Sequence, residues 1–162
     1  MRKIKHLMLI MLFISCHSNE PEAVSFNLSE IIVQQSPWTL DRVEINEVKG
    51  TNGYIFTQSE IDEMAVIIKN DRFSIFEFYN DGTGLWDSKY YCPNCELTWE
   101  ELLGENKVRW AYRVYFRYFE IRTTDEVIEL VENRRNENGF KIYKPDGTFI
   151  SGDFLNETYV WK

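Results

Sequence analysis

Residues 108–118 read VRWAYRVYFRY, a stretch in which large apolar side chains alternate with a second set made up mostly of arginines. A period of two is that of a β-strand, because successive side chains point to opposite faces of a sheet. The stretch therefore predicts one long strand with one apolar face. Phe119 and Ile121 continue the apolar side on the opposite parity, which predicts a bulge, bend or turn near Tyr118.

Other segments rich in aromatic and β-branched residues predict further strands over 38–48, 72–79, 84–91, 127–132, 140–143 and 158–161. Turn signals separate them, since Asp81-Gly82, Asn138-Gly139 and Asp146-Gly147 supply residues that tolerate a positive φ. Many short antiparallel strands with few helices are typical of a barrel or a sandwich. The chain is therefore predicted to be an all-β protein.

Two segments carry helix signals. Thr57 and Glu60 have the spacing of a capping box, and Ile61, Met64, Ala65 and Ile68 follow at helical spacing. This helix is expected to close one end of the sheet. Residues 98–101 read TWEE and precede Leu102, Leu103 and Gly104, a pattern that predicts another turn of helix.

Composition limits the kind of protein. A chain of 162 residues with 44% hydrophobic and 15% aromatic residues has enough apolar material for one folded domain and is not typical of disorder. The formal net charge of −8 argues against nucleic-acid binding, which needs clustered Lys and Arg.

The N-terminus has the features of a secretory signal. Arg2, Lys3 and Lys5 precede the apolar run 7–14, which is too short to span a bilayer. The ending Phe13-Ile14-Ser15-Cys16 resembles a bacterial lipobox, which implies that Cys16 is acylated, with palmitate among the expected chains, and becomes the new N-terminus. The alternative is an ordinary secretory signal followed by a coincidental Cys. The expected division is a signal peptide over 1–15, a lipid-anchored tether over 16–36 and one domain over 37–162.

The domain itself resembles the lipocalin-like lipoprotein domains of Gram-negative bacteria. The likeness lies in Pro37-Trp38-Thr39-Leu40 at the opening strand, in Asn80-Asp81-Gly82-Thr83-Gly84 after an aromatic strand, and in the closing residues 157–162, ETYVWK. It implies an antiparallel up-and-down β-barrel whose interior can hold a small apolar ligand. Together with His17, rather than Asp, after Cys16, it implies an anchor in the outer membrane, with the domain facing the periplasm or the surface.

Catalytic chemistry has little support in the sequence. The two histidines, His6 and His17, both precede the predicted domain, so a Ser–His–Asp or Cys–His site and a His-ligated metal site are not expected there. The many carboxylates show no spacing that selects a catalytic pair. We therefore predict no enzyme activity, no catalytic residue, no cofactor and no metal site.

Cys92 and Cys95 form a CxxC motif in a compartment that permits disulfides. The favoured interpretation is a structural disulfide that fixes a tight loop. A redox-active pair is the alternative, because a helix beginning after Cys95 would lower the pKa of a thiol at its N-terminus. A zinc site is disfavoured, since two of the four ligands that it needs are missing.

Basic and aromatic residues supply the candidate binding site. Four basic residues lie on the polar parity of the long strand, namely Lys107, Arg109, Arg113 and Arg117. The favoured interpretation is that they face water. The alternatives are that one or two of them bind a ligand carboxylate, or that the row docks an acidic partner. Among the five tryptophans, Trp99 is expected to be exposed beside the CxxC loop. Trp99, Trp110 and Arg113 are the candidate ligand-binding residues.

These features favour a cell-envelope lipoprotein that binds a small apolar or amphipathic ligand at the barrel mouth, near the helix and the 92–103 loop. A structural or protein-interaction lipoprotein of an envelope complex, with a filled barrel, is the first alternative. A thiol–disulfide redox protein that uses Cys92 and Cys95 is the second. The expected partners are the membrane through the anchor, a small ligand and another envelope protein, with no nucleic acid.

Overall fold

The computed structural model describes residues 27–124 and 127–162, so the predicted leader, Cys16 and most of the tether lie outside the described residues. Nine strands form one antiparallel sheet in the order β1-β2-β3-β4-β5-β6-β7-β9-β8. The strands are β1 (Trp38–Gly50), β2 (Ser74–Phe78), β3 (Thr83–Ser88), β4 (Cys92–Leu102), β5 (Lys107–Tyr112), β6 (Tyr115–Thr124), β7 (Val127–Asn136), β8 (Phe140–Tyr143) and β9 (Phe149–Trp161). The helices are α1 (Leu28–Gln34), the 3₁₀ turn η1 (Thr51–Gly53) and α2 (Gln58–Asp71).

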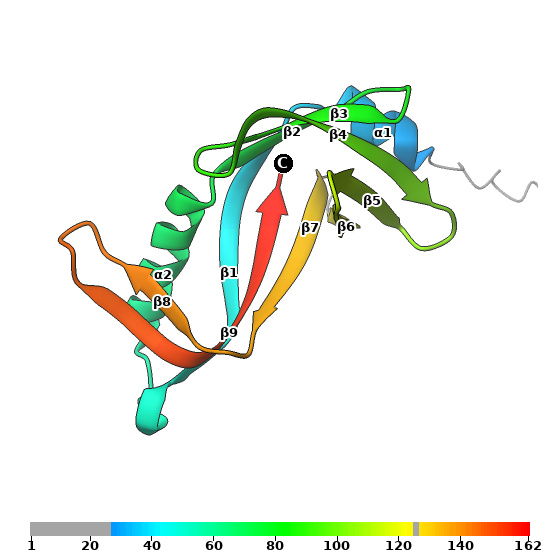
Figure 1. Ribbon diagram of the computed structural model, residues 1–162. Helices are drawn as coiled ribbons and strands as arrows, with labels where there is room; N and C mark the ends of the chain where they lie inside the picture. The colour runs from blue at the N-terminus through cyan, green and yellow to red at the C-terminus, as the bar shows by residue number, and fades with distance from the viewer. Residues whose placement is uncertain (1–26, 125–126) are drawn as a thin grey trace, which may run out of the picture.

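The sheet closes on itself because β1 also pairs with β9. Eight strands therefore form a closed antiparallel barrel, as predicted, and β8 is an additional strand on the first half of β9. In Figure 1, α2 and β8 lie together on one side of β1, away from the β5–β6 hairpin. No helix in the described part of the chain is long and apolar enough to cross a membrane.

The prediction of one continuous strand over 108–118 is wrong. Tyr112 pairs with Tyr115, so Arg113 and Val114 form a two-residue turn between β5 and β6, and Arg113 adopts a φ of 54°. The turn shifts the alternation of the side chains. After the turn, Arg117 and Phe119 lie on the interior face with their partners Trp110 and Val108, whereas Phe116 and Tyr118 lie on the outer face. Phe119 is fully buried, whereas Phe116 is 63% exposed.

The prediction of a helical turn at 98–101 is also wrong, since these residues belong to β4. Trp99 pairs with Trp110 of β5, and Thr98 pairs with Thr83 of β3. The whole segment pairs with β5 and Thr98 pairs with β3 as well, and this pairing outweighs a local capping pattern of only four residues. Trp99 is half-buried against Phe78, with ring centroids 5.4 Å apart, and not exposed as expected.

The helix over α2 is confirmed. The Thr57 side chain accepts a hydrogen bond from the Glu60 N–H, and the Glu60 carboxylate accepts one from the Thr57 N–H at 2.8 Å. Met64, Ile67 and Ile68 are buried in the same apolar cluster as the barrel core. The predicted turns are confirmed as well, with positive φ at Gly82, Gly139 and Gly147.

One end of the barrel is closed by α1, which contacts β2 and β4. Ile32 is fully buried, and its carbonyl accepts a hydrogen bond of 2.8 Å from Trp38 Nε1. Ser29 donates from its hydroxyl and its backbone N–H to the Glu101 carboxylate. The described fold therefore includes α1, which precedes residue 37, the predicted start of the domain.

Aromatic rings fill the barrel from this closed end inward. The Phe76 ring has its centroid 5.0 Å from those of Trp110 and Phe119 and 5.6 Å from that of Trp161. These residues belong to one continuous cluster of buried side chains that also includes Trp38, Phe78 and Leu130. The aromatic cluster therefore fills the barrel from the end that α1 closes.

An ion cluster lies on the outer face of the closed end. The buried Glu129 carboxylate accepts hydrogen bonds of 2.9 and 3.1 Å from Arg42 and lies 3.3 Å from Lys162 Nζ. The hydrogen bonds from Arg42 are the main reason that the pKa of Glu129 is held below its usual value. The unfolded chain therefore binds a proton at this position before the folded protein does.

We expect this difference to make the barrel less stable in acid. The contribution of Glu129 is fully present above its unfolded pKa, near 4.5, and is lost as the pH falls through its lower folded pKa. Glu129→Gln lacks this contribution, so the gap in unfolding free energy between the two proteins should narrow below pH 4.5. Urea titrations across the pH range measure the gap, and a gap that stays constant would contradict the account.

Candidate functional site

The mouth of the barrel lies opposite α1. The ends of β3 and β5 and the starts of β2, β4 and β6 meet there, as the pairings Ser74–Ser88, Ser88–Cys92 and Tyr112–Tyr115 show. The mouth encloses a cavity of about 100 Å³. Its wall includes three arginines, two tryptophans and two serines, namely Arg72, Arg117, Arg134, Trp86, Trp110, Ser74 and Ser88.

Two tryptophans of this wall have indole N–H groups without a partner among the described residues. The Nε1 atoms of Trp86 and Trp110 are buried and have no hydrogen-bond partner within residues 27–124 and 127–162. Trp110 is only 4% exposed. By contrast, Trp38 donates to Ile32 O, Trp99 to Tyr79 O and Thr83 O, and Trp161 to Ser74 Oγ. A buried donor without a partner costs roughly 1–3 kcal/mol, so unpartnered donors at a cavity mark a place for an acceptor.

The buried Glu132 carboxylate binds two of the arginines, Arg117 and Arg134. Glu132 is 4% exposed and accepts a hydrogen bond of 2.7 Å from Arg117 Nη1 and one of 2.9 Å from Arg134 Nη2. The Arg134 guanidinium also lies 4.1 Å from the centroid of the Tyr159 ring. Burial, together with the neighbouring Glu157, raises the pKa of Tyr159, so this hydroxyl stays protonated and donates to Glu157.

Arg72 completes the rim from the C-terminal end of α2. It donates a hydrogen bond to the Tyr91 hydroxyl, and its guanidinium lies 5.1 Å from the Tyr91 ring centroid. Tyr91 is 57% exposed and precedes β4 directly. The pair therefore links α2 to the β3–β4 connection across the edge of the mouth.

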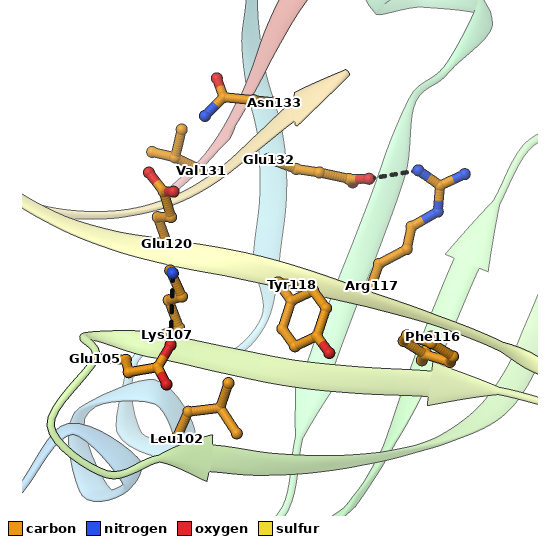
Figure 2. A pocket seen from close by; sticks show the side chains of 10 residues that line it. All are labelled: Leu102, Glu105, Lys107, Phe116, Arg117, Tyr118, Glu120, Val131, Glu132 and Asn133. Atoms are coloured by element: carbon orange, nitrogen blue, oxygen red, sulfur yellow. Dashed lines mark hydrogen bonds and ion pairs between the residues drawn. The ribbon is translucent and has the colours of Figure 1, made fainter. Parts of the chain in front are cut away.

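A second hollow lies on the outside of the barrel, where β6 and β7 separate. Among the described residues, β6 pairs with β7 only over Glu120–Thr124, whereas 115–119 pair with β5 and 132–136 pair with β9. The resulting groove has a volume of about 590 Å³ and is lined by Leu102, Phe116 and Tyr118 among others. In Figure 2, Arg117 and Glu132 point toward each other across the space between the two strands. Because Arg117 lines both hollows, this ion pair stands between the groove and the mouth.

The structure separates the three predicted ligand-binding residues. Trp110 lines the mouth. Arg113 lies in the β5–β6 turn, exposed, with its guanidinium 5.0 Å from the ring centroid of Tyr112. Trp99 lies nearer the closed end, and its N–H is satisfied by backbone carbonyls.

The expectation that Lys107, Arg109, Arg113 and Arg117 share one face is wrong for Arg117. Arg109 pairs with Tyr118 on the outer face, and its side chain lies 2.6 Å from Glu100. Arg117 follows the turn and shares the interior face with Trp110, its partner on β5. The parity of Phe119 and Ile121 did predict a bulge, bend or turn, but near Tyr118, whereas the turn lies at Arg113 and Val114, before Arg117. Arg72, Arg134 and Trp86 carried no comparable signal.

Cys92 and Cys95 are joined by a disulfide beside the mouth. Cys95 pairs with Trp86, and its Sγ lies 3.5 Å from the Tyr112 hydroxyl oxygen. The residues after Cys95 continue as strand β4, so the helix that would activate a thiol is absent from this described segment. The geometry therefore favours a structural role, in which the disulfide fixes the start of β4 at the rim.

Comparison with known proteins does not add to this description. The chain matches no protein-family model, and neither the curated proteins nor the solved structures contain a match. Within the described residues, no three His, Cys, Asp or Glu side chains gather to hold a metal ion. The functional argument therefore rests on the mouth and the groove.

Proposed function

We propose that this chain is a lipid-anchored protein of the bacterial cell envelope whose barrel binds a small amphipathic ligand at its mouth. One observation carries the proposal, namely that two tryptophans that line the same cavity, Trp86 and Trp110, each have a buried indole N–H without a partner among the described residues. A donor buried without a partner is uncommon in folded proteins and is satisfied when a ligand supplies an acceptor.

The filled core favours an amphipathic ligand over a wholly apolar one. Phe76, Phe119 and Trp161 occupy the interior where an apolar ligand would otherwise lie. The cavity accepts the polar end of the ligand. Three tyrosines near the cavity are largely exposed, namely Tyr90 (62%), Tyr91 (57%) and Tyr115 (68%). Such rings provide apolar surface for the rest of the ligand.

The anchor would hold the barrel by its closed end. Leu28 begins α1 at that end, and from Cys16 to Leu28 a fully extended chain spans at most about 40 Å. The mouth then lies at the end of the barrel away from the attachment point. This orientation suits a protein that takes up or presents a ligand while it is tethered to a membrane.

Native mass spectrometry of the chain from residue 17 onward tests the proposal. That form retains α1 through β9, which share one apolar core. After secretion to a bacterial periplasm and purification without detergent, we expect a protein that binds one equivalent of an added amphiphile. Failure to bind any of a panel of anionic, neutral and cationic amphiphiles would contradict the proposal.

A structural or protein-interaction role is the second candidate. The β5–β6 hairpin exposes several large apolar side chains on its tip and outer face, namely Val114, Tyr115, Phe116 and Tyr118. A cluster of this kind is typical of a contact surface. A protein that binds no amphiphile but recovers a defined envelope protein, with the recovery lost in Phe116→Ser, would favour this candidate.

A further inference from the structure

We infer that the barrel mouth recognises an oxyanion, a carboxylate or a phosphate group, at the polar end of its ligand. The inference rests on the proposed binding function and specifies the chemistry of the group that the mouth accepts. It follows from three properties of the cavity, which are its hydrogen-bond donors, its charge and its size.

The donors of the cavity outnumber its acceptors. The indole N–H groups of Trp86 and Trp110 can only donate, and neither finds an acceptor among the described residues. Arginine also only donates, with five N–H groups on each guanidinium. Glu132 takes one hydrogen bond from Arg117 and two from Arg134, so further guanidinium N–H groups stay available. A ligand group that satisfies this wall must be rich in acceptors.

The charge of the mouth has the sign that attracts an anion. Three guanidinium groups, those of Arg72, Arg117 and Arg134, lie in the wall. Two carboxylates face them, since Glu132 binds Arg117 and Arg134, and Glu157 accepts from Tyr159 beneath Arg134. The local balance is therefore positive in a chain whose formal net charge is −8. A charged oxygen accepts a stronger hydrogen bond from the indoles than a neutral oxygen does, and only an anion also uses this excess positive charge.

The size of the cavity limits what enters it. A volume of about 100 Å³ exceeds the roughly 10–15 Å³ that one water requires and holds a carboxylate or phosphate group. It is too small for a long acyl chain, and two of its lining residues, Phe76 and Trp110, pack against each other with ring centroids 5.0 Å apart. The apolar part of the ligand must then leave the cavity along the aromatic rim.

Titration with amphiphiles that share one tail tests the inference. The probes are dodecanoate, dodecyl phosphate and dodecanol, all below their micelle-forming concentrations, added to the chain from residue 17 onward. We expect both anions to bind about tenfold or more tightly than dodecanol, since hydrogen bonds to a charged group are strong in a buried site. A preference between the two anions identifies the source of the oxyanion as an acid or a phosphate ester.

Variants distinguish binding of the anion at the mouth from a general attraction of anions to basic side chains on the surface. Trp110→Phe keeps an aromatic ring but removes one N–H donor, and it should weaken dodecanoate binding about tenfold and dodecanol binding by a smaller factor. Arg109→Gln is the control, because Arg109 is an exposed cation on the outer face of the same strand and should have no effect.

The outcomes of the titration are distinct. Equal binding of dodecanol and the two anions, or equal loss of all three in Trp110→Phe, would overturn the oxyanion inference and leave the binding function intact. Binding of none of them by a folded protein would overturn both. Weaker anion binding in Arg109→Gln than in Trp110→Phe would place any anion site on the outer face and overturn the inference as well.

Discussion

Phe119→Ala should reduce the unfolding free energy of the barrel by about 3–5 kcal/mol. Phe119 has no exposed surface and packs edge-on against Phe76 and Trp161, with centroids 5.0 Å away in both cases. Its removal leaves a cavity in a rigid cluster of rings that cannot close over it. Urea unfolding followed by tryptophan fluorescence measures the loss as a lower midpoint.

Phe116→Ala is the matched control in the same strand. Phe116 is 63% exposed on the outer face of β6, so its truncation should change the unfolding free energy by no more than about 0.5 kcal/mol. The pair of variants also tests the position of the hairpin turn. A continuous strand over 108–118 would bury Phe116 instead, so a larger loss in Phe116→Ala than in Phe119→Ala would contradict the β5–β6 hairpin.

Glu132→Gln should cost about 3 kcal/mol of unfolding free energy. The carboxylate side chain of Glu132 is 5% exposed, and the amide that replaces it cannot neutralise Arg117 and Arg134. Breaking a buried ion pair on one side costs about 3–5 kcal/mol, and the lower end applies because the Arg117 side chain is 49% exposed and can turn to water. Thermal and urea unfolding both report the change.

A surface pair provides the control for this variant. Glu137 lies 2.7 Å from Arg135, but both side chains are more than 60% exposed. Glu137→Gln should therefore change the unfolding free energy by at most about 0.5 kcal/mol. Equal losses of unfolding free energy in Glu132→Gln and Glu137→Gln would contradict the account, in which Glu132 forms a buried ion pair with Arg117 between the mouth and the groove.

The sequence predicts the parts of the fold that depend on local chemistry. The capping box of Thr57 and Glu60, the glycine turns and strand β8 over 140–143 all have strong local signals, and all are confirmed. Many short strands with turns between them predict a barrel or a sandwich, and the resemblance implied the barrel. Its closure by the β1–β9 pair is a long-range contact that the resemblance implied and that the pattern of individual strands does not specify.

Three errors have a shared physical cause, because in each case tertiary packing outweighs a weak local signal. Arg113 adopts a positive φ without any of the usual turn residues, so the β5–β6 turn leaves no composition signal. Residues 98–101 look like a helix start, but they pair with β5, and Thr98 also pairs with β3. The short helix α1 gains its stability from burying Ile32 in the end of the barrel.

The site was predicted only in part for the same reason. Trp110 was among the predicted ligand-binding residues because aromatic residues line barrels, and it does lie in the mouth. Arg72 and Arg134 come from α2's end and from β7, and only the closed barrel brings them near Trp86 and Arg117. A set of residues so far apart in sequence has no spacing that a single chain can reveal.

The indole N–H resonances provide the most direct test that the mouth is a ligand site. A ¹⁵N correlation spectrum of the chain from residue 17 onward contains one such signal for each of its five tryptophans, and Trp→Phe variants assign them. On addition of dodecanoate, dodecyl phosphate and dodecanol in turn, we predict that a binding amphiphile shifts the signals of Trp86 and Trp110. The signals of Trp38 and Trp99, which donate to backbone carbonyls, should stay in place. Shifts confined to Trp38 or Trp99, or no shift with any amphiphile, would contradict ligand binding at the mouth.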